Sequence, residues 1–521
     1  MGFWIFSIIS IVGVHVGLYK LFEKAGIAGW KAFVPFYNYY LCVKLIGKPV
    51  WWFLLLFVPI VNAVMIFLIA TELVKAYGKD GFWAGVASMM IPQFYYPFIG
   101  FDKKVKYLGP PHEVYKGKKK TFWREWADAI AFAVIAATFI RTFFFEAYTI
   151  PTTSMESTLL AGDFLFVSKF HYGPRFPMTP VAFPFAHHTM PFIGGKAYSE
   201  IIKLPYFRLP GLQNIHRNDI VVFNFPEGDT VYLPDPSQDF YDYKRQGTPG
   251  RPFTYRPDQI TTRPLDKREN YIKRCVAIPG DSLKVVNGVL YINGELAYQP
   301  ENLQKSYTLY SKPNVVISDD FLVDQGVDTL DREARSRRFY EDRSSSVVVS
   351  LTQEIYEKLK PNPAIDRIEP TYYPNSHSDV SVNVVNFQRT YPHNLNVQRN
   401  SNDEFGPIYV PKKGETVAIN KNTYPFYKRI IESYEHNKIS YDKEGNPYIN
   451  NQPLTEYTFK QNYYWLMGDN RHRSLDSRYW GFVPEDHVVG KAEMVWWSWN
   501  SKVPFFQRFG TIRWDRVMRF V

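Results

Sequence analysis

The stretch VAIPGDSLKVVNGVLYING, residues 276–294, decides the fold of the larger part of this 521-residue chain. Asn287-Gly288 separates two short apolar runs, and Asn293-Gly294 follows the second run. An Asn-Gly pair between such runs favours the tight turn of a β-hairpin, because both central residues of that turn need a positive φ. The stretch therefore predicts an antiparallel hairpin.

The rest of the chain after Ile150 has a similar character, with short apolar runs broken by turn signals. The sequence YINN, residues 448–451, predicts a second hairpin of the same kind. Between about residues 299 and 406 the composition becomes charged and irregular, which indicates an inserted subdomain with one or two helices, for example Thr352–Leu359. We therefore expect a mainly β core that carries an α+β insertion.

Four apolar stretches precede this core, and each approaches the roughly 20 residues needed to cross about 30 Å of hydrocarbon. The first lacks the basic start and the cleavage site of a signal peptide, so we interpret it as a retained span. The third contains Pro92 and several tyrosines, and it could instead lie in the membrane interface. The sequence predicts about four transmembrane helices, at Phe3–Leu18, Val50–Leu73, Phe82–Phe101 and Ala127–Phe145.

Loop charges predict how these helices are oriented, because lysine-rich and arginine-rich loops stay in the cytoplasm. The loops after the first and third stretches are rich in lysine, so the chain after Phe145 should lie outside the cytoplasm. The predicted domains are a membrane-embedded region with about three spans and a basic cytoplasmic loop at 1–125, a last transmembrane helix at 126–149, the two parts of the catalytic β core at 150–300 and 406–521, and the inserted subdomain at 301–405.

Composition narrows the possible partners and cofactors. The formal net charge is +11, but the basic residues are spread over loops, so a basic surface facing anionic lipid explains them better than nucleic-acid binding does. The two cysteines, Cys42 and Cys275, fall in different predicted regions. Without a CxxC pair, a His/Cys cluster or an HExxH motif, the sequence predicts no disulfide, no metal site and no cofactor.

A candidate nucleophile, Ser154, lies in the sequence IPTTSM at residues 150–155, directly after the last apolar stretch. A serine hydroxyl is a weak nucleophile and needs a base within hydrogen-bond reach. Pro151 restricts the backbone shortly before Ser154, and Gly162-Asp163 is expected to form a turn soon after it. Backbone amides around such a turn could form an oxyanion hole, with the Thr152 hydroxyl as a second donor.

The candidate base is Lys273, which lies among apolar neighbours in YIKRCVAI, residues 271–278. A lysine with the ordinary pKa of about 10.4 is neutral less than about once in a thousand times at pH 7, but burial lowers that pKa by several units. Ser154 Oγ and Lys273 Nζ should then lie within about 3 Å of each other. The alternative is that Lys273 reaches solvent from a strand edge.

A polar loop, GDNRHRSLDSR at residues 468–478, could complete such a site. Asp476 and Arg478 could form a charge pair that holds the loop, while Ser474 or Ser477 could hydrogen-bond the neutral lysine. Metal binding through Asp469 and Asp476 is the other interpretation, but the arginines between them argue against it.

These segments together resemble the type I signal peptidases, the membrane-bound Ser/Lys serine proteases of bacteria. Four separate regions carry the resemblance, in the order expected of that family: residues 150–169 are similar to its nucleophile box, 218–223 to its Gly-Asp-x-Val-x-Phe strand, 271–281 to its lysine box, and 468–492 to its Gly-Asp-Asn-Arg box and the Gly-x-Ala that follows.

The resemblance implies roles for individual residues. Ser154 would be the nucleophile, Lys273 the general base, Thr152 the side-chain oxyanion donor and Ser474 the residue that orients the lysine. An extended substrate would add as a strand beside Ile150, and Met155 and Ile272 would line shallow apolar pockets that admit small side chains, as cleavage after Ala-x-Ala requires. Asp476 and Arg478 would support the loop.

The chain departs from the family pattern in three places, at five positions. Thr152 replaces the usual serine, Glu156 and Ser157 replace an apolar residue and a proline, and His472 and Arg473 stand where Asp and Asn are common. The first two departures affect the oxyanion site and the rigidity of the turn, and the third changes the charge of the loop.

By resemblance, the chain is expected to be a multi-pass endopeptidase of the bacterial plasma (inner) membrane with its catalytic domain on the periplasmic side. It would remove N-terminal signal peptides from exported preproteins, with the lipid bilayer and the secretion translocon as further partners and no nucleic acid. Two alternatives are a self-cleaving repressor-type Ser/Lys protease, which would carry DNA-binding helices at its N-terminus, and a catalytically inactive membrane scaffold. Retention of both Ser154 and Lys273 disfavours the scaffold.

Overall fold

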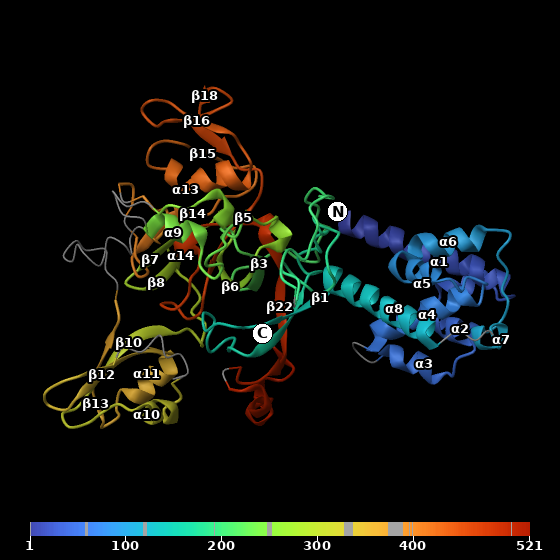
Figure 1. The fold of residues 1–521 in the computed structure, drawn as a ribbon, viewed down its shortest axis with the longest axis horizontal. Coiled ribbons are helices and arrows are strands. Elements are labelled where there is room, and N and C mark those ends of the chain that lie inside the picture. Colours follow the sequence, from blue (N-terminus) through green and yellow to red (C-terminus); the bar gives the residue numbers. More distant parts are fainter. Residues whose placement is uncertain are drawn as a thin grey trace. The chain divides into compact units, whose positions relative to one another are not determined.

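The computed structural model describes residues 2–57, 61–117, 122–191, 193–246, 253–327, 337–372, 389–394, 396–398, 400–501 and 503–521. The chain forms two compact units, one made of residues 1–144 with 209–212 and one made of residues 145–208 with 213–521. The first unit is helical and the second is built mainly from strands (Figure 1).

The helical unit packs around a core that includes Leu21, Phe22, Ile46 and Ile99. Helices α1 and α6 approach closely at Gly17. Any larger residue there would place its Cβ only 2.6 Å from the Pro97 nitrogen. The elements of this unit are α1 (Gly2–Lys24), η1 (Gly29–Phe33), α2 (Tyr37–Leu45), α3 (Trp51–Leu54), η2 (Leu55–Phe57), α4 (Val61–Lys75), α5 (Phe82–Met90), α6 (Pro92–Phe101), α7 (Pro111–Val114) and α8 (Phe122–Phe143).

The prediction of about four transmembrane helices was wrong. Within the described residues, the structure contains no helix that is both long enough and apolar enough to cross a membrane. The expected second span is divided among α3, η2 and α4, and α4 has only 15 residues. The expected third span is divided at Pro92, which lacks an N–H group and therefore begins α6 instead of continuing α5. The expected first and fourth spans correspond to α1, which carries Lys20, Glu23 and Lys24 near its end, and to α8, which carries Arg141 in its last turn.

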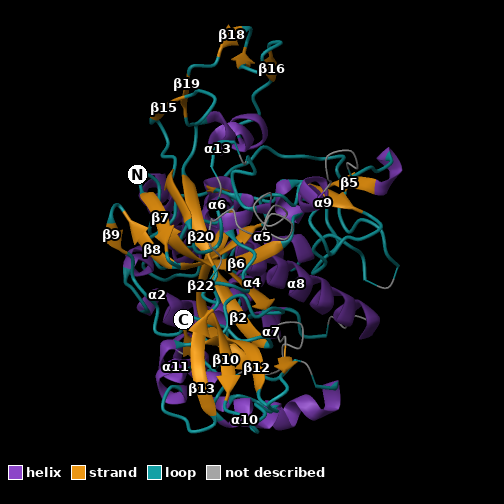
Figure 2. Cartoon of the chain, turned by 90° about the vertical axis from the view of Figure 1, so that its left-hand side faces the viewer, coloured by secondary structure: helices purple, strands orange, loops and turns teal. Residues whose placement is uncertain are grey.

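The second unit contains an eight-stranded antiparallel sheet that positions the candidate site. The strand order is β1-β2-β22-β3-β6-β20-β21, and β23 pairs with β22. In Figure 2, strands β6, β20, β22 and β2 form the central part of this sheet. Their bounds are β1 (Phe145–Thr149), β2 (Asp163–Ser168), β3 (Ile220–Asn224), β6 (Asn270–Ala277), β20 (Tyr463–Met467), β21 (Val483–Pro484), β22 (Val488–Ser498) and β23 (Arg519–Phe520).

Both predicted hairpins are confirmed. Strands β7 (Ser282–Val286) and β8 (Val289–Ile292) pair across Asn287 and Gly288, which have φ values of 50° and 69°. Strands β17 (Pro447–Ile449) and β18 (Gln452–Pro453) pair across Asn450 and Asn451, both with positive φ. The first hairpin belongs to the sheet β14-β7-β8-β9, with β9 (Glu295–Leu296) and β14 (Phe405–Tyr409).

A third sheet lies within the sequence region expected to hold the insertion. It has the order β11-β12-β10-β13 and its own buried cluster, which includes Leu309, Leu322 and Val347. Thr352 accepts a hydrogen bond from the Ile355 amide and begins the predicted helix, α11. The elements are β10 (Lys305–Ser311), α10 (Asp319–Asp324), β11 (Arg337–Phe339), β12 (Ser345–Leu351), α11 (Gln353–Leu359) and β13 (Ile365–Pro370).

Short elements complete the second unit. They are β4 (Thr230–Tyr232), α9 (Phe240–Gln246), η3 (Pro257–Gln259), β5 (Ile260–Thr262), η4 (Leu265–Lys267), β15 (Thr416–Ala418), α13 (Tyr424–Arg429), η6 (Ile430–Tyr434), β16 (Ile439–Tyr441), β19 (Glu456–Thr458), α14 (Ser477–Trp480), η7 (Glu485–His487), η8 (Phe505–Thr511) and η9 (Trp514–Arg516).

Candidate active site

Ser154 lies in the loop between β1 and β2, within a series of tight turns at residues 152–159 that we call the nucleophile turn. The Glu156 amide donates to the Thr153 carbonyl at 3.0 Å, and the Leu159 amide donates to the Met155 carbonyl at 2.7 Å. Met155 and Leu159 are fully buried, so they anchor the turn in the core below it. The position of Ser154 is therefore set by local hydrogen bonds and by the packing of its neighbours.

Lys273 lies in the middle of β6, opposite Val221 of β3. Its Nζ donates to Ser154 Oγ at 2.7 Å and to the Ile272 carbonyl at 2.9 Å. Lys273 is 4% exposed and Ser154 is 8% exposed, so this hydrogen bond is shielded from water. The expected separation between the two side chains is confirmed, and the interpretation of Lys273 as a solvent-reaching lysine is wrong.

Burial lowers the pKa of Lys273 to about 8. The carboxylates of Asp476 and Asp469 act in the opposite direction, because negative charge nearby stabilises the ammonium form. The result is an amine that is neutral in a useful fraction of molecules near neutral pH. That property is what a lysine needs in order to accept a proton from a serine hydroxyl.

Thr152 is exposed, and its Oγ1 lies 3.4 Å from Ser154 Oγ. The Thr152 hydroxyl is therefore near the nucleophile, on a residue that solvent reaches.

The polar loop at residues 468–478, which we call the catalytic loop, follows β20 and ends in α14. Asp476 accepts hydrogen bonds from Arg478 Nε at 2.9 Å and Arg478 Nη2 at 2.8 Å, and also from the Gly468 amide at 3.1 Å. Both charged side chains are buried, at 0% and 1% exposure. The hydrogen bond from Gly468 to Asp476 thus joins the two ends of the loop, and the ion pair with Arg478 holds Asp476 in place.

Ser474 is buried, and within the described residues its hydroxyl makes no hydrogen bond of good geometry to Lys273, although it lies close enough to Asp476 to help lower the pKa of that carboxyl. The hydroxyl lies against Gly468, and a side chain at Gly468 would also place its Cβ 2.5 Å from the Ser154 carbonyl oxygen. Glycine at 468 therefore allows the catalytic loop to lie directly against the backbone of Ser154.

The structure reveals contacts that the sequence did not indicate. The Asn470 amide donates to the Ser154 carbonyl at 3.2 Å, so the catalytic loop holds the nucleophile through its backbone. Asp469 is fully buried and accepts two hydrogen bonds from Arg274, at 2.8 and 2.7 Å, and one from Thr158 Oγ1 at 2.6 Å. Asp469 therefore links β6, the nucleophile turn and the catalytic loop. The available signal was Arg274, the residue after Lys273, because a buried aspartate needs a partner.

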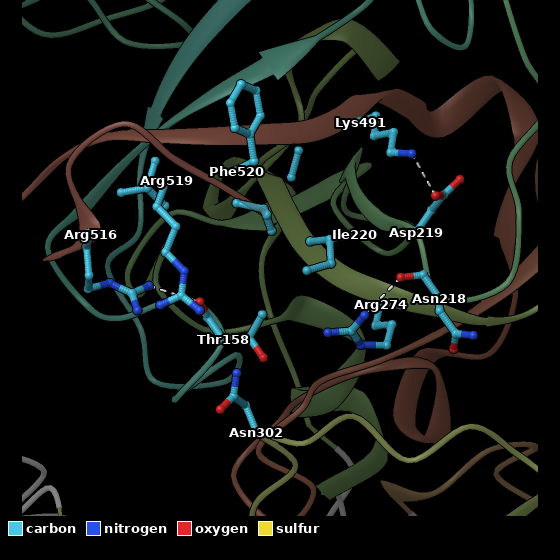
Figure 3. A pocket seen from close by; sticks show the side chains of 13 residues that line it. Thr158, Asn218, Asp219, Ile220, Arg274, Asn302, Lys491, Arg516, Arg519 and Phe520 are labelled. Atoms are coloured by element: carbon cyan, nitrogen blue, oxygen red, sulfur yellow. Dashed lines mark hydrogen bonds and ion pairs between the residues drawn. The ribbon is translucent and has the colours of Figure 1, made fainter.

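A cavity of about 250 Å³ lies beside this Asp469 network (Figure 3). Thr158 and Arg274 line it, but neither Ser154 nor Lys273 does. Lys491 in its wall pairs with Asp219 at 2.9 Å, and Arg516 pairs with Asp163. The pair of Arg516 and Asp163 contributes to the support of the nucleophile turn, since Arg516 also donates to the Thr158 carbonyl at 2.9 Å.

The three residues expected to contact substrate belong to one apolar cluster. Ile150 is 3% exposed and Met155 is buried, while Ile272 is partly buried against them. The Ile150 amide donates to the Asp163 carbonyl, and its carbonyl accepts from the Gly162 amide, both at 2.9 Å. The Ile150 N–H is thus already used within the chain, so a substrate strand would need donors from the residues that follow.

Ser157 stands where the resembling family has proline, and its φ of 67° explains the difference, because proline requires φ near −65°. We expect Ser157→Pro to destabilise the second unit by about 3 kcal/mol or more and to lower activity, since the nucleophile turn would have to change its backbone. Chemical unfolding and a cleavage assay measure both effects.

The matched control for this substitution is Ser157→Gly. Glycine adopts positive φ freely and loses only the hydrogen bond that Ser157 Oγ accepts from Gln304 Nε2 at 2.7 Å, a cost of about 1 kcal/mol, so it is the control for the stability readout. Equal stability of Ser157→Pro and the unchanged chain would contradict the observed turn.

Comparisons with known proteins agree with this geometry. The family model described as "Signal peptidase, peptidase S26" matches residues 123–336 and 408–497, and a family of unknown function matches residues 30–110. Signal peptidase I of Buchnera aphidicola subsp. Acyrthosiphon pisum is 24% identical over 395 residues, which cover 75% of this chain and 80% of that protein. Signal peptidase I of Aquifex aeolicus is 24% identical over 373 residues, which cover 71% and 82%. Signal peptidase I of Pseudomonas aeruginosa is 41% identical over 75 residues, which cover 12% and 26%.

The matched ranges contain Ser154, Lys273 and the whole catalytic loop. Because the family model covers more than half of the chain, the chain belongs to the signal peptidase family, peptidase S26, and is a serine endopeptidase that removes signal peptides.

Proposed function

We propose that this signal peptidase cleaves its substrates by attack of Ser154 Oγ, with Lys273 Nζ as the general base. The observation that carries the proposal is the 2.7 Å hydrogen bond between these two buried groups. Burying a lysine charge is costly unless the charge is neutralised or paired. A buried lysine held at this distance from a serine hydroxyl is therefore best explained as the base for that serine. The relatives are all named signal peptidases, which favours the enzyme over an inactive scaffold.

The neutral Lys273 amine would accept the Ser154 hydroxyl proton as Oγ bonds to the carbonyl carbon of the scissile peptide. The resulting ammonium would return the proton to the leaving amine, which leaves an ester between Ser154 and the signal peptide. Water, deprotonated by the same amine, would then hydrolyse the ester and regenerate the hydroxyl.

The Thr152 hydroxyl and the Ser154 amide would stabilise the oxyanion that forms in both steps. The 3.4 Å separation of Thr152 Oγ1 from Ser154 Oγ and the exposure of Thr152 support this role. A threonine retains the donor, while its extra methyl group adds bulk beside the oxyanion.

Ser474 would orient Lys273 when substrate is bound. Its buried hydroxyl lies in the same loop that supports Ser154 and beside Asp476, the carboxylate that also acts on Lys273. Asp476 and Arg478 would keep that loop in shape through their ion pair.

The substrates are preproteins that carry signal peptides. We propose that Ile150, Met155 and Ile272 form the apolar floor that selects small side chains, as in an Ala-x-Ala sequence. The catalytic core would consist of residues 150–300 and 406–521, with residues 301–405 inserted. The site would act at the periplasmic face of the bacterial plasma membrane, where signal peptides emerge from the translocon beside lipid.

The proposal predicts how the cleavage rate depends on pH. Only the neutral lysine can accept the serine proton, and the pKa of Lys273 is about 8. We therefore expect the single-turnover rate to fall about tenfold for each pH unit below 8 and to level off above it. The measurement is cleavage of a preprotein with an Ala-x-Ala site by the full chain. A rate that stays constant as pH falls from about 8 to about 6 would show that another group is the base.

A further inference from the structure

Residues 301–405 make contacts that reach the catalytic centre. The signal peptidase family model leaves residues 337–407 unmatched, so much of this segment is absent from the family pattern. Nevertheless, the Tyr391 amide donates to the Arg478 carbonyl at 2.9 Å, and the Asp403 side chain contacts His472. Both Arg478 and His472 belong to the catalytic loop.

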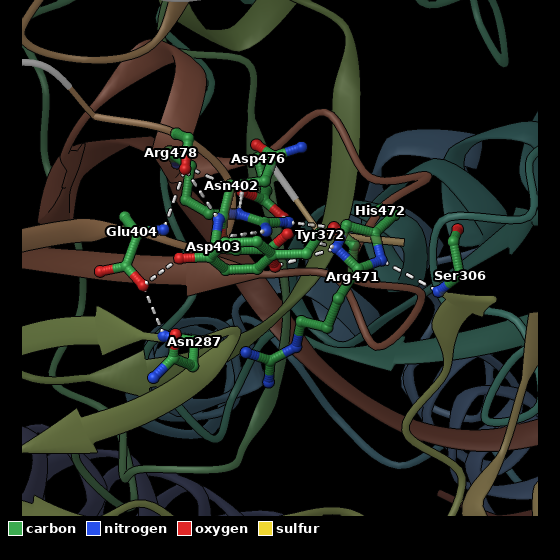
Figure 4. Close-up of polar contacts among 11 residues, drawn as sticks. Asn287, Ser306, Tyr372, Asn402, Asp403, Glu404, Arg471, His472, Asp476 and Arg478 are labelled. Atoms are coloured by element: carbon green, nitrogen blue, oxygen red, sulfur yellow. Dashed lines mark hydrogen bonds and ion pairs between the residues drawn. The ribbon is translucent and has the colours of Figure 1, made fainter. Parts of the chain in front are cut away.

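His472 is held from two sides (Figure 4). Its Nδ1 accepts a hydrogen bond from the Ser306 amide at 2.9 Å, and its Nε2 lies 2.9 Å from Asp403 Oδ1. Since Nδ1 accepts, the proton of the neutral ring is on Nε2, where it is donated to Asp403. The His472 and Asp403 side chains are only 5% and 6% exposed. This residue, which departs from the family pattern, thus connects the catalytic loop to both ends of the 301–405 segment.

Asp403 is itself anchored to the β7–β8 hairpin. The Gly288 amide donates to the Asp403 carbonyl at 2.9 Å, and the Asn287 amide donates to Glu404 Oε1 at 2.8 Å (Figure 4). A turn fixed by local backbone preference therefore holds the backbone of Asp403, the residue whose carboxylate faces His472.

Gln304 contacts both the catalytic loop and the nucleophile turn. Its amide donates to the Asp469 carbonyl and its carbonyl accepts from the Arg471 amide, each at 2.9 Å. Its side-chain Nε2 donates to Ser157 Oγ at 2.7 Å, and the residue is 5% exposed. One buried residue of this segment is thus hydrogen-bonded to both the catalytic loop and the nucleophile turn.

These contacts surround the place where the catalytic loop supports the nucleophile. Gln304 holds the backbone at Asp469 and Arg471, and between them the Asn470 amide donates to the Ser154 carbonyl at 3.2 Å. The side chain of Gln304 joins this backbone-paired region to the nucleophile turn through Ser157 Oγ, so its truncation leaves the backbone bonds in place but releases the turn. Because a displacement of about 1 Å at a reacting group can lower a rate by about 100-fold, loss of that side-chain bond should affect the chemical step.

We propose that the 301–405 segment braces the active site, and that Gln304 and His472 are positioning residues for Ser154 and the catalytic loop. The inference rests on the proposed function, because it assumes that Ser154 is the nucleophile. The contrasting possibility is an independent module that only binds a partner, in which case these two residues would not affect the turnover of bound substrate.

The test compares kcat and KM of the full chain carrying Gln304→Ala or His472→Ala. We expect kcat to fall about 10- to 100-fold while KM stays within about threefold, because the groups act on the reacting serine and not on substrate affinity. His472→Gln should recover part of kcat, because a glutamine side chain can still donate to Asp403. Gln353→Ala is the matched control, since Gln353 is an exposed residue of α11 in the same segment.

Ser154→Ala separates failure of this inference from failure of the proposed function. If Ser154→Ala abolishes cleavage while folded Gln304→Ala and His472→Ala retain full kcat, the bracing role is wrong. A rise in KM at unchanged kcat also overturns it and indicates substrate binding instead. If Ser154→Ala cleaves normally, the proposed function itself is wrong. Thermal unfolding identifies any variant that fails to fold. If His472→Ala does not fold, the kcat values of His472→Gln and Gln304→Ala decide the outcome.

Discussion

Lys273→Met should lower kcat for signal-peptide removal by about 10⁴-fold or more while the chain stays folded. Methionine has nearly the length of the lysine side chain but cannot accept a proton, so the Ser154 hydroxyl loses its base. Ser154→Ala should have an effect of similar size, because residues that act as one unit are not additive. The double variant should therefore be no slower than either single variant.

The same substitution should not destabilise the protein near pH 7. The pKa of Lys273 is about 8 in the folded chain and 10.5 for an ordinary lysine, as in the unfolded chain, a difference of about 2.5. Below pH 8 both states hold the proton, and burial of the charge then costs the folded state about 3 kcal/mol. Between pH 8 and 10.5 the unfolded chain binds more protons, so this cost disappears as pH rises. Methionine removes the cost, which offsets the lost hydrogen bonds.

Lys284→Met is the matched control, because Lys284 is an exposed lysine of β7. It should retain full activity. Cleavage of a preprotein and urea unfolding near pH 7 give both readouts. Retention of more than about a tenth of wild-type kcat by Lys273→Met would rule out Lys273 as the base.

Asp476→Ala should destabilise the second unit by about 3 to 5 kcal/mol, which is the largest stability effect we expect from a single side chain. Arg478 is 1% exposed, and removal of Asp476 would leave its guanidinium buried without its carboxylate. The Gly468 amide would also lose its acceptor. Because this loop supports Ser154, activity should fall together with stability.

The exposed pair of Asp366 and Arg367 provides the control, since both side chains are about half exposed. Asp366→Ala should change stability by less than about 1 kcal/mol. Asp476→Asn should fall between the two, because it keeps an acceptor but loses the charge. Urea unfolding of the three variants measures the order, and an Asp476→Ala effect no larger than that of Asp366→Ala would contradict the role of the buried pair.

Parts of the fold could be predicted because they depend on neighbouring residues. The hairpin at Asn287-Gly288 needs only residues that tolerate positive φ between two apolar runs, and the structure has that turn. Thr352 likewise begins α11 through a hydrogen bond to an amide three residues later. The membrane helices were predicted from the length of apolar stretches, and Pro92 was interpreted only as a sign that the third stretch could lie in the interface, whereas in the structure it begins a separate helix.

The sequence by itself determined that a serine, a lysine and a polar loop with glycine at 468 were present in an order typical of one peptidase family. Only the tertiary structure decided that Lys273 and Ser154, 119 residues apart, share a hydrogen bond, and that burial brings the pKa of that lysine to about 8. The contacts of Gln304, His472 and Asp403 also came from the tertiary structure. The reason is physical: a turn depends on adjacent φ and ψ angles, whereas burial, pKa and ion pairing depend on groups that only the folded chain brings together.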